Sequence, residues 1–323
     1  QIIDAGSMED VNIAKATINV LWQITRKFIE QPETNAFHFQ EHFLRPFFEI
    51  FIVQQSAEVK GLIVECTSSL VNDLANSLHS GWSVVFQIMN ACAVDYRSKG
   101  YELMTKVVNE HLQDLSSSQI VHLQSVLISF VLKGKTPKIG AKAVLLFEKI
   151  ASFLSHINAD NEVWGCFFAS LQKCIMSPTP IIKKRAVLST VEIMQKEKVS
   201  DSVKETIINE FVPSVFNLFV EPEMTNLLTE IMDIPLKIEL KLDILMKCCL
   251  HENPDFSLNS LTLLSVFLSN NSDEISSSNL RTVVVDDIKK LCKLKRVELV
   301  IFFSKALKTF ENDKKMKKSI ISV

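Results

Sequence analysis

Apolar residues that recur every three or four positions are the feature that most constrains this chain, because that spacing places them on one face of an α-helix. The pattern runs through most of the 323 residues. Clear examples are the stripes Val59, Leu62, Ile63, Cys66, Leu70, Leu74, Leu78 and Val144, Phe147, Ile150, Ala151, Leu154. Short polar or proline-containing segments lie between such stretches, several with Ser, Asp or Asn where a helix N-cap is expected. The sequence therefore predicts successive amphipathic helices with short connections.

These helices can be paired into units of similar length. The units begin near residues 10, 58, 97, 137, 179, 235 and 274, so most intervals are about 40 residues. That period is typical of HEAT repeats, in which each hairpin has too little core alone and stacks on its neighbours. Thr282–Val285 has the composition of a strand, but inside a helical array we interpret it as a buried helix face. We predict an all-α fold, an α-solenoid of HEAT/armadillo-like helical hairpins.

The interval from 179 to 235 is too long for one hairpin. We expect an extra short helix at Glu221–Met232. Pro213, Pro222 and Pro235 make this segment the expected joint between two sub-arrays, because proline interrupts helices.

Composition narrows the classes of function. The chain has only 7 glycines, so tight turns and glycine-rich phosphate loops are few. A net charge of −2 without a basic stripe argues against nucleic acid as a partner. A basic cluster near the end is interpreted as a solvated terminus, with weak attraction to anionic lipid as the alternative; it comprises Lys314, Lys315, Lys317 and Lys318.

Cysteine usage and hydropathy indicate a compartment. Seven cysteines without a regular disulfide framework favour a reducing environment. The most apolar run, Ala143–Ile157, is interrupted by Glu148 and Lys149, so we do not expect a membrane-spanning helix. No N-terminal signal sequence is visible, and a start at Gln1 leads us to expect an internal segment of a longer protein.

One motif has the residue pattern of a zinc-hydrolase site. His38, Glu41 and His42 match H-x-x-E-H, and two such histidines can face one metal on an unbroken helix. Pro46 follows four residues later, and no third ligand accompanies the motif. We interpret these residues as part of a surface helix and keep a metal-dependent hydrolase as a minor alternative.

Two other motifs depart from the pattern that their chemistry requires. Gly134-Lys135-Thr136 resembles the end of a phosphate loop, but Ser129 stands where the first glycine belongs, so we expect a helix C-terminus. Cys248 and Cys249 with His251 lack a second ligand pair and are interpreted as a buried helix end. We predict no catalytic, cofactor-binding or metal-binding residues, and no cofactor.

Two further motifs can serve either the core or a partner, and we assign them to partner binding as a hypothesis: Arg45, Pro46, Phe47, Ser80, Gly81 and Trp82. Trp82 has apolar neighbours, so a packed core is the first interpretation. Ser80 is a candidate N-cap, and Gly81 permits close approach at a helix start. Arg45 can contact a partner or place its guanidinium against helix C-terminal carbonyls. Asp95 and Arg97 flank a turn, and we expect an ion pair between them.

Four linked motifs between Glu9 and Asp95 resemble a known family. They are Lys27-Phe28-Ile29-Glu30, Phe39-Gln40, Phe43-Leu44-Arg45-Pro46-Phe47 and Ser80-Gly81-Trp82. Their order and spacing resemble the first homology domain downstream of the catalytic domain (HDS) in the large Golgi Arf guanine-nucleotide exchange factors, the brefeldin-sensitive, secretory-seven or BIG type. The family usually has an acidic residue where His42 stands and Glu where Phe48 stands.

A weaker similarity follows. Val163-Trp164-Gly165, with Arg185–Leu188 and Glu192–Met194, looks like the second downstream domain. The resemblance predicts three parts: a first downstream homology domain at 1–135, a second at 136–220, and further HEAT-like repeats with a basic C-terminal end at 221–323.

The resemblance implies a non-catalytic regulatory and membrane-recruitment segment that binds a GTP-loaded Arf-family GTPase and modulates exchange in vesicle traffic. It also implies a cytoplasmic location with peripheral association on Golgi or trans-Golgi membranes, and it is compatible with self-association. Exchange chemistry in that family belongs to another domain, whose catalytic loop we do not find here. The alternative is a generic HEAT-repeat scaffold between proteins, without exchange activity.

Overall fold

The computed structural model describes residues 1–31, 33, 38–133, 137–215, 226–234, 236–277, 280–292 and 308. Every regular element in these residues is a helix, which confirms the all-α prediction. The chain divides into two compact units, Gln1–Val199 and Ser200–Val323. This division falls inside the long interval where a joint was expected, whereas the domain boundaries near 135 and 220 stay predictions.

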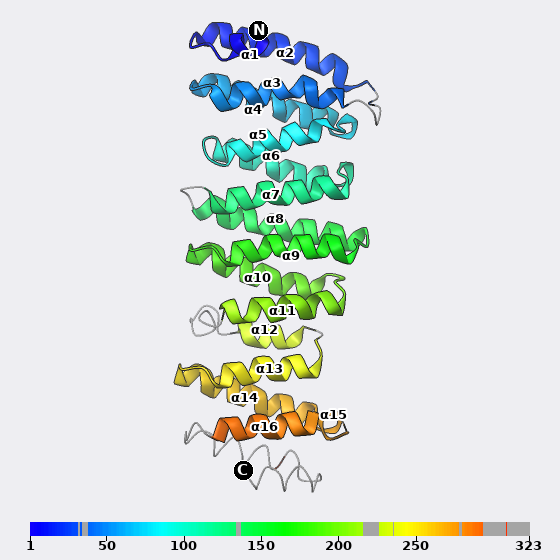
Figure 1. The fold of residues 1–323 in the computed structure, drawn as a ribbon, viewed down its shortest axis with the longest axis vertical. Coiled ribbons are helices and arrows are strands. Elements are labelled where there is room, and N and C mark those ends of the chain that lie inside the picture. The colour runs from blue at the N-terminus through cyan, green and yellow to red at the C-terminus, as the bar shows by residue number, and fades with distance from the viewer. Residues whose placement is uncertain are drawn as a thin grey trace. The chain divides into compact units, whose positions relative to one another are not determined.

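The first unit is a solenoid of helical hairpins (Figure 1). Its α-helices are α1 (Ile2–Gly6), α2 (Val11–Ile29), α3 (Phe39–Val53), α4 (Ala57–Leu74), α5 (Gly81–Cys92), α6 (Arg97–Glu110), α7 (Ser117–Leu132), α8 (Pro137–His156), α9 (Asn161–Ile175) and α10 (Pro180–Lys196). Two short 3₁₀ helices, η1 (Ala75–Ser77) and η2 (Leu112–Asp114), complete it.

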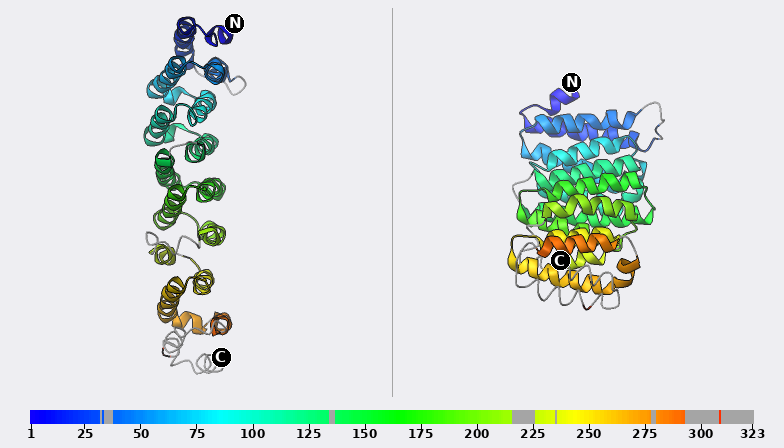
Figure 2. Two further views of the ribbon diagram at one scale, coloured as in Figure 1. Left: turned by 90° about the vertical axis from the view of Figure 1, so that its left-hand side faces the viewer. Right: turned by 60° about the horizontal axis from the view of Figure 1, so that its bottom comes forward.

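The hairpins stack in two layers. Helices α3, α5, α7 and α9 pack on one another in chain order, and α2, α4, α6, α8 and α10 form the second layer. The C-terminal ends of α3, α5, α7 and α9 share one edge, at the left of Figure 1, which we call the carboxyl edge. Their N-terminal ends share the opposite edge, which we call the amino edge. The left panel of Figure 2 shows the carboxyl edge face-on.

The second unit contains α11 (Asp201–Val215), α12 (Leu227–Asp233), α13 (Ile238–Cys249), α14 (Pro254–Asn270), α15 (Ser272–Ser277) and α16 (Leu280–Cys292). Helix α13 packs against α14, and α15 against α16. The expected extra helix is present as α12. Thr282–Val285 is helical, as interpreted, and Val284 and Val285 are buried, but Thr282 is exposed. Residues 221–225, Pro222, Pro235 and the terminal lysine cluster lie outside the described residues.

Local signals explain where the helices begin. Asp10, Ser56, Asp160 and Asn253 accept hydrogen bonds from the first backbone amides of α2, α4, α9 and α14. Ser116 forms a capping box at α7 with Gln119. Helices α2, α4, α6, α8, α10, α13 and α15 start at residues 11, 57, 97, 137, 180, 238 and 272, which confirms the predicted pairing.

The predicted stripes form the core. Val144, Phe147, Ile150, Ala151 and Leu154 of α8 are all fully buried. Fully burying a Val, Leu, Ile or Phe side chain stabilises the fold by about 1.5–3 kcal/mol, so the layers are held mainly by apolar packing. No helix in the described part of the chain is long and apolar enough to span a membrane.

Candidate partner-binding site at the α3–α5 junction

The two motifs assigned to partner binding meet where α3 packs beside α5. Phe47 of α3 is 2% exposed, and Trp82 of α5 is fully buried and stacks on Phe86 with ring centroids 5.5 Å apart. These aromatic side chains form the core of the junction, as the first interpretation of Trp82 had it. They can therefore act on a partner only by fixing the groups around them.

Gly81 sets how closely α5 approaches α3. A Cβ atom at this position would lie 2.8 Å from Leu78 Cδ2 and 2.9 Å from Leu44 Cδ1. Real Cβ contacts are essentially never this short, so any larger residue would displace these side chains. The close approach expected of Gly81 is confirmed, and it links the Ser-Gly-Trp motif to α3.

Gln40 ties three segments of the junction together. Its side chain is fully buried. The Nε2 amide donates to the Ile29 carbonyl at 3.1 Å and to the Ser77 carbonyl at 2.8 Å. The Oε1 atom accepts from the His79 backbone N–H at 2.8 Å. One amide thus satisfies polar groups at the end of α2 and in the turn before α5, which apolar side chains cannot do.

Glu33 and Ser80 accept hydrogen bonds from backbone amides at the N-terminal end of α3. The Glu33 carboxylate accepts from the Ser80 hydroxyl at 2.6 Å, the Ser80 backbone N–H at 2.9 Å and the Gln40 backbone N–H at 3.1 Å. The Ser80 hydroxyl also accepts from the Glu41 backbone N–H at 3.1 Å. Two of the first amide groups of α3 are therefore satisfied by side chains distant in sequence.

The prediction that Ser80 caps α5 with its side chain is wrong. Ser80 occupies the N-cap position of α5, but its hydroxyl does not cap that helix. Instead it caps α3 and pairs with Glu33. Burial alone would raise the pKa of Glu33, but the hydrogen bonds from Ser80 and Gln40, aided by the nearby His38, outweigh it and hold that pKa below its ordinary value.

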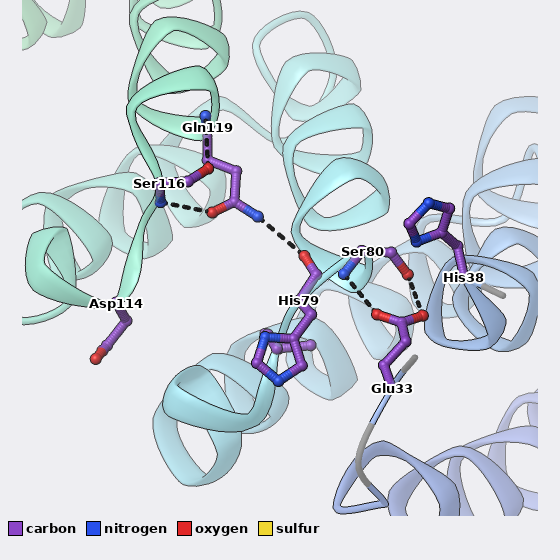
Figure 3. A pocket seen from close by; sticks show the side chains of 8 residues that line it. Glu33, His38, His79, Ser80, Asp114, Ser116 and Gln119 are labelled. Atoms are coloured by element: carbon purple, nitrogen blue, oxygen red, sulfur yellow. Dashed lines mark hydrogen bonds between the residues drawn. The ribbon is translucent and has the colours of Figure 1, made fainter. Parts of the chain in front are cut away.

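A polar hollow of about 490 Å³ opens beside this cluster on the amino edge (Figure 3). It is lined by Glu33, His38, Leu78, His79, Ser80, Asp114, Ser116 and Gln119. Glu33 and Ser80 point toward each other, and the Gln119 amide donates to the His79 carbonyl at 2.9 Å. The carboxylates of Glu33 and Asp114 supply hydrogen-bond acceptors, so the hollow fits a donor or cationic side chain.

Arg45 and Pro46 lie on the more accessible side of α3. The Arg45 guanidinium forms an ion pair with Glu41 one turn earlier, not with helix C-terminal carbonyls. Its side chain is 51% exposed, so the group is available to a partner. Helix α3 continues through Pro46, although proline cannot donate to the carbonyl four residues earlier. The partner-binding role of all six residues stays a prediction.

The expected Asp95–Arg97 pair is not formed. Asp95 pairs with Lys60 of α4 at 3.1 Å. The buried Arg97 guanidinium donates to the Ala93 carbonyl at 3.2 Å and to the Phe130 carbonyl of α7. Buried carbonyl groups need donors, and Arg97 presents several in a planar array, so it joins α6 to α7.

The remaining motifs can now be placed. His38 precedes α3 at its N-cap position, whereas Glu41 and His42 lie inside the helix. Within the described ranges no three His, Cys, Asp or Glu side chains are grouped so that they could hold a metal ion. Cys248 and Cys249 are buried at the end of α13, as interpreted, and burial raises the pKa of the Cys248 thiol to about 12. Gly134-Lys135-Thr136 lies outside the described residues.

Sequence reasoning missed Gln40 and Glu33 as the polar centre of the junction. Their partners lie between 7 and 47 residues away, and neither residue belongs to a pattern of helical spacing. From the sequence, Gln40 was part of the Phe39-Gln40 motif, and no structural role was predicted for it. The available signal was a polar residue in the first turn of an apolar helix.

Comparison with known proteins shows which family the sequence around this junction resembles. Residues 27–110 match the family described as Mon2/Sec7/BIG1-like, HDS. This segment of the chain is therefore similar to an HDS domain. It begins in the last turn of α2 and ends with α6, so it contains Gln40, Glu33 and both motifs of the junction. The predicted resemblance is confirmed for this segment.

Two curated proteins are also similar in sequence to parts of this chain. Brefeldin A-inhibited guanine nucleotide-exchange protein 4 of Arabidopsis thaliana is 27% identical over 221 residues, covering 57% of this chain and 13% of the relative. Protein 1 of the same name and organism is 31% identical over 121 residues, covering 36% of this chain and 7% of the relative. The matched part is thus a small fraction of each relative. The TSC2 N-terminus aligns over 99% of this chain and 97% of that chain, at 8% identity and a TM-score of 0.40.

Proposed function

We propose that this chain is a non-catalytic regulatory and membrane-recruitment segment of a Golgi Arf guanine-nucleotide exchange factor, and that it binds an Arf-family GTPase in its GTP form. The observation that carries the proposal is the match of residues 27–110 to the HDS family, together with the similarity of the chain to proteins named as guanine nucleotide-exchange proteins. Its location is then cytoplasmic and peripheral on Golgi or trans-Golgi membranes. A solenoid has long exposed surfaces suited to such a role.

We place the partner contact on the accessible groups around the α3–α5 junction. Phe47, Gly81 and Trp82 are inside, so they act by holding α3 and α5 in position. Arg45 and the polar hollow on the amino edge remain as the groups that a partner can reach. A contact there fits a partner surface that offers both carboxylates for Arg45 and donors for the hollow.

A vesicle flotation assay tests the nucleotide preference. A membrane-anchored Arf-family GTPase is loaded with a non-hydrolysable GTP analogue or with GDP, and the 323-residue chain is added. We expect saturable recruitment with the GTP form and little with GDP. Equal recruitment by both forms would refute the GTP-dependent part of the proposal.

The position of the contact is tested with a matched pair of arginine variants. Arg45→Ala and Arg26→Ala each remove a half-exposed arginine that pairs with an acidic residue, Glu41 or Asp73. Only Arg45→Ala should weaken recruitment, because Arg26 lies outside the proposed contact. If both variants bind as well as the parent chain, the contact is elsewhere.

An exchange assay tests the non-catalytic part. The chain alone should not accelerate nucleotide release from the GTPase, and a clear acceleration would show that exchange activity resides here. The alternative function is a HEAT-repeat scaffold that joins other proteins in membrane traffic. It is supported if the chain binds neither form of the GTPase.

A further inference from the structure

The carboxyl edge of the first unit carries exposed apolar side chains where surface residues are usually polar. Leu132 ends α7, Met176 follows α9, and Ile181 is the second residue of α10; they are 42%, 64% and 52% exposed. Helix α7 packs on α9, and α8 on α10, so the two turns that carry these residues are neighbours on this edge (Figures 1 and 2). The three exposed apolar side chains therefore belong to two neighbouring turns of one edge.

Exposed cations flank these apolar side chains. Lys133 follows Leu132, Lys138 lies in the first turn of α8, and Arg185 lies one turn after Ile181 on the same helix face. None of the three forms an ion pair with any residue that the structure describes. We call these six residues, Leu132, Lys133, Lys138, Met176, Ile181 and Arg185, the basic apolar patch.

The sequence around the patch lacks opposing charge. Residues 115–147 and 163–191 contain no Asp or Glu at all. Elsewhere on the same edge, acidic residues do lie next to exposed apolar side chains. Val53 and Val94 are also exposed, but Glu58 and Asp95 follow them and pair with Lys15 and Lys60. Among the described turns on this edge of the first unit, those that follow α3 and α5 carry paired acidic residues, whereas those that follow α7 and α9 carry cations without them.

We propose that the basic apolar patch rests on an anionic membrane surface. The apolar tips would enter the boundary between headgroups and acyl chains, and the cations would lie beside lipid phosphates and carboxylates. The patch sits on the ends of hairpins along one edge, which suits an extended flat surface better than a peptide that needs a groove. The proposal rests on the membrane association proposed above and names the surface and the lipid charge.

Vesicle sedimentation without any GTPase tests this inference. The 323-residue chain is mixed with phosphatidylcholine vesicles that contain or lack phosphatidylserine. We expect binding only with phosphatidylserine, and weaker binding as salt is raised. Removing one cation should weaken binding about five-fold, and the Leu132→Ser/Met176→Ser/Ile181→Ser variant should lose about ten-fold or more.

Matched variants separate the patch from overall charge. K133E/K138E/R185E should abolish binding, whereas K27E/K149E/K198E changes the net charge equally at exposed lysines outside the patch and should retain most of it. Circular dichroism confirms that each variant is folded.

Two results would overturn the inference: failure of the parent chain to bind anionic vesicles, or equal loss in the two charge variants. The first would point to an acidic protein as the occupant. Because no GTPase is present, either result leaves the proposed GTPase binding to be judged by the flotation assay.

Discussion

Gln40 offers the sharpest test of how the α3–α5 junction is held. Gln40→Leu keeps a similar volume but removes three hydrogen bonds, two to carbonyls and one from a backbone amide. Each is worth about 1 kcal/mol, and the bond to Ile29 is fully buried, so its loss leaves a carbonyl without a partner at about 1–3 kcal/mol. Allowing for the apolar gain from leucine, we expect a loss of about 2–4 kcal/mol in the free energy of unfolding.

Gln124 provides the control. It is equally buried, but its Oε1 accepts a single 3.4 Å bond from Ser170, and its Nε2 has no partner among the described residues. Ser170 also donates to the Cys166 carbonyl at 3.0 Å, so it retains a partner after the change. Gln124→Leu should therefore alter stability by less than about 1 kcal/mol.

Thermal unfolding and hydrogen exchange measure the difference. A loss of 2–4 kcal/mol lowers the melting temperature by roughly 5–15 °C for a unit of this size. Exchange should accelerate first in the amides of α3 and α5, because Gln40 joins them through the intervening turn. If Gln40→Leu and Gln124→Leu destabilise the chain equally, burial alone governs both sites, and the reasoning about the hydrogen bonds is wrong.

Two further predictions concern a pair of helical glycines and the carboxylate of Glu33. Gly81→Ala should lower stability by about 1–3 kcal/mol because its Cβ meets Leu44 and Leu78, whereas Gly165→Ala has open space and should raise it by about 0.5–1 kcal/mol; both are read by thermal unfolding. The pKa of Glu33 is lowered in the folded chain, so its contribution is present above its ordinary value of 4.5 and is lost as pH falls through the folded pKa. Glu33→Gln should therefore lower the free energy of unfolding at neutral pH and make that free energy fall less steeply as the pH is lowered. If the fall in acid is the same in the variant and the parent chain, the Glu33 carboxylate does not contribute in this way.

The helices could be predicted from the sequence because their signals are local. Stripes such as Val144 to Leu154 and caps such as Ser116 depend on residues within one or two turns. The stacking followed from the spacing of the helix starts, since one hairpin cannot bury its own apolar face. The joint near residue 200 was placed only within a long interval, because contacts between helices decide where one unit ends.

The polar centre of the site could not be predicted in the same way. Ser80 was expected to cap its own helix, a local rule, but Glu33 and the start of α3 compete for the same hydroxyl. Asp95 was expected to pair with Arg97, two residues away, but its carboxylate pairs with Lys60 of α4, 35 residues away in sequence. In both cases a long-range partner replaced the short-range one, and the sequence does not encode that distance directly.

The burial of the family motifs changes where recognition must be sought. Phe47, Gly81 and Trp82 carry the resemblance, yet their side-chain positions are filled by contacts within the chain. Such residues identify a fold because substitutions there disturb packing, whatever the fold binds. Specificity for a partner then depends on accessible groups that the junction only holds in place, such as Arg45 and the lining of the polar hollow. Two chains with this same junction can therefore bind different partners, and changes confined to those accessible groups should alter affinity while leaving thermal stability unchanged.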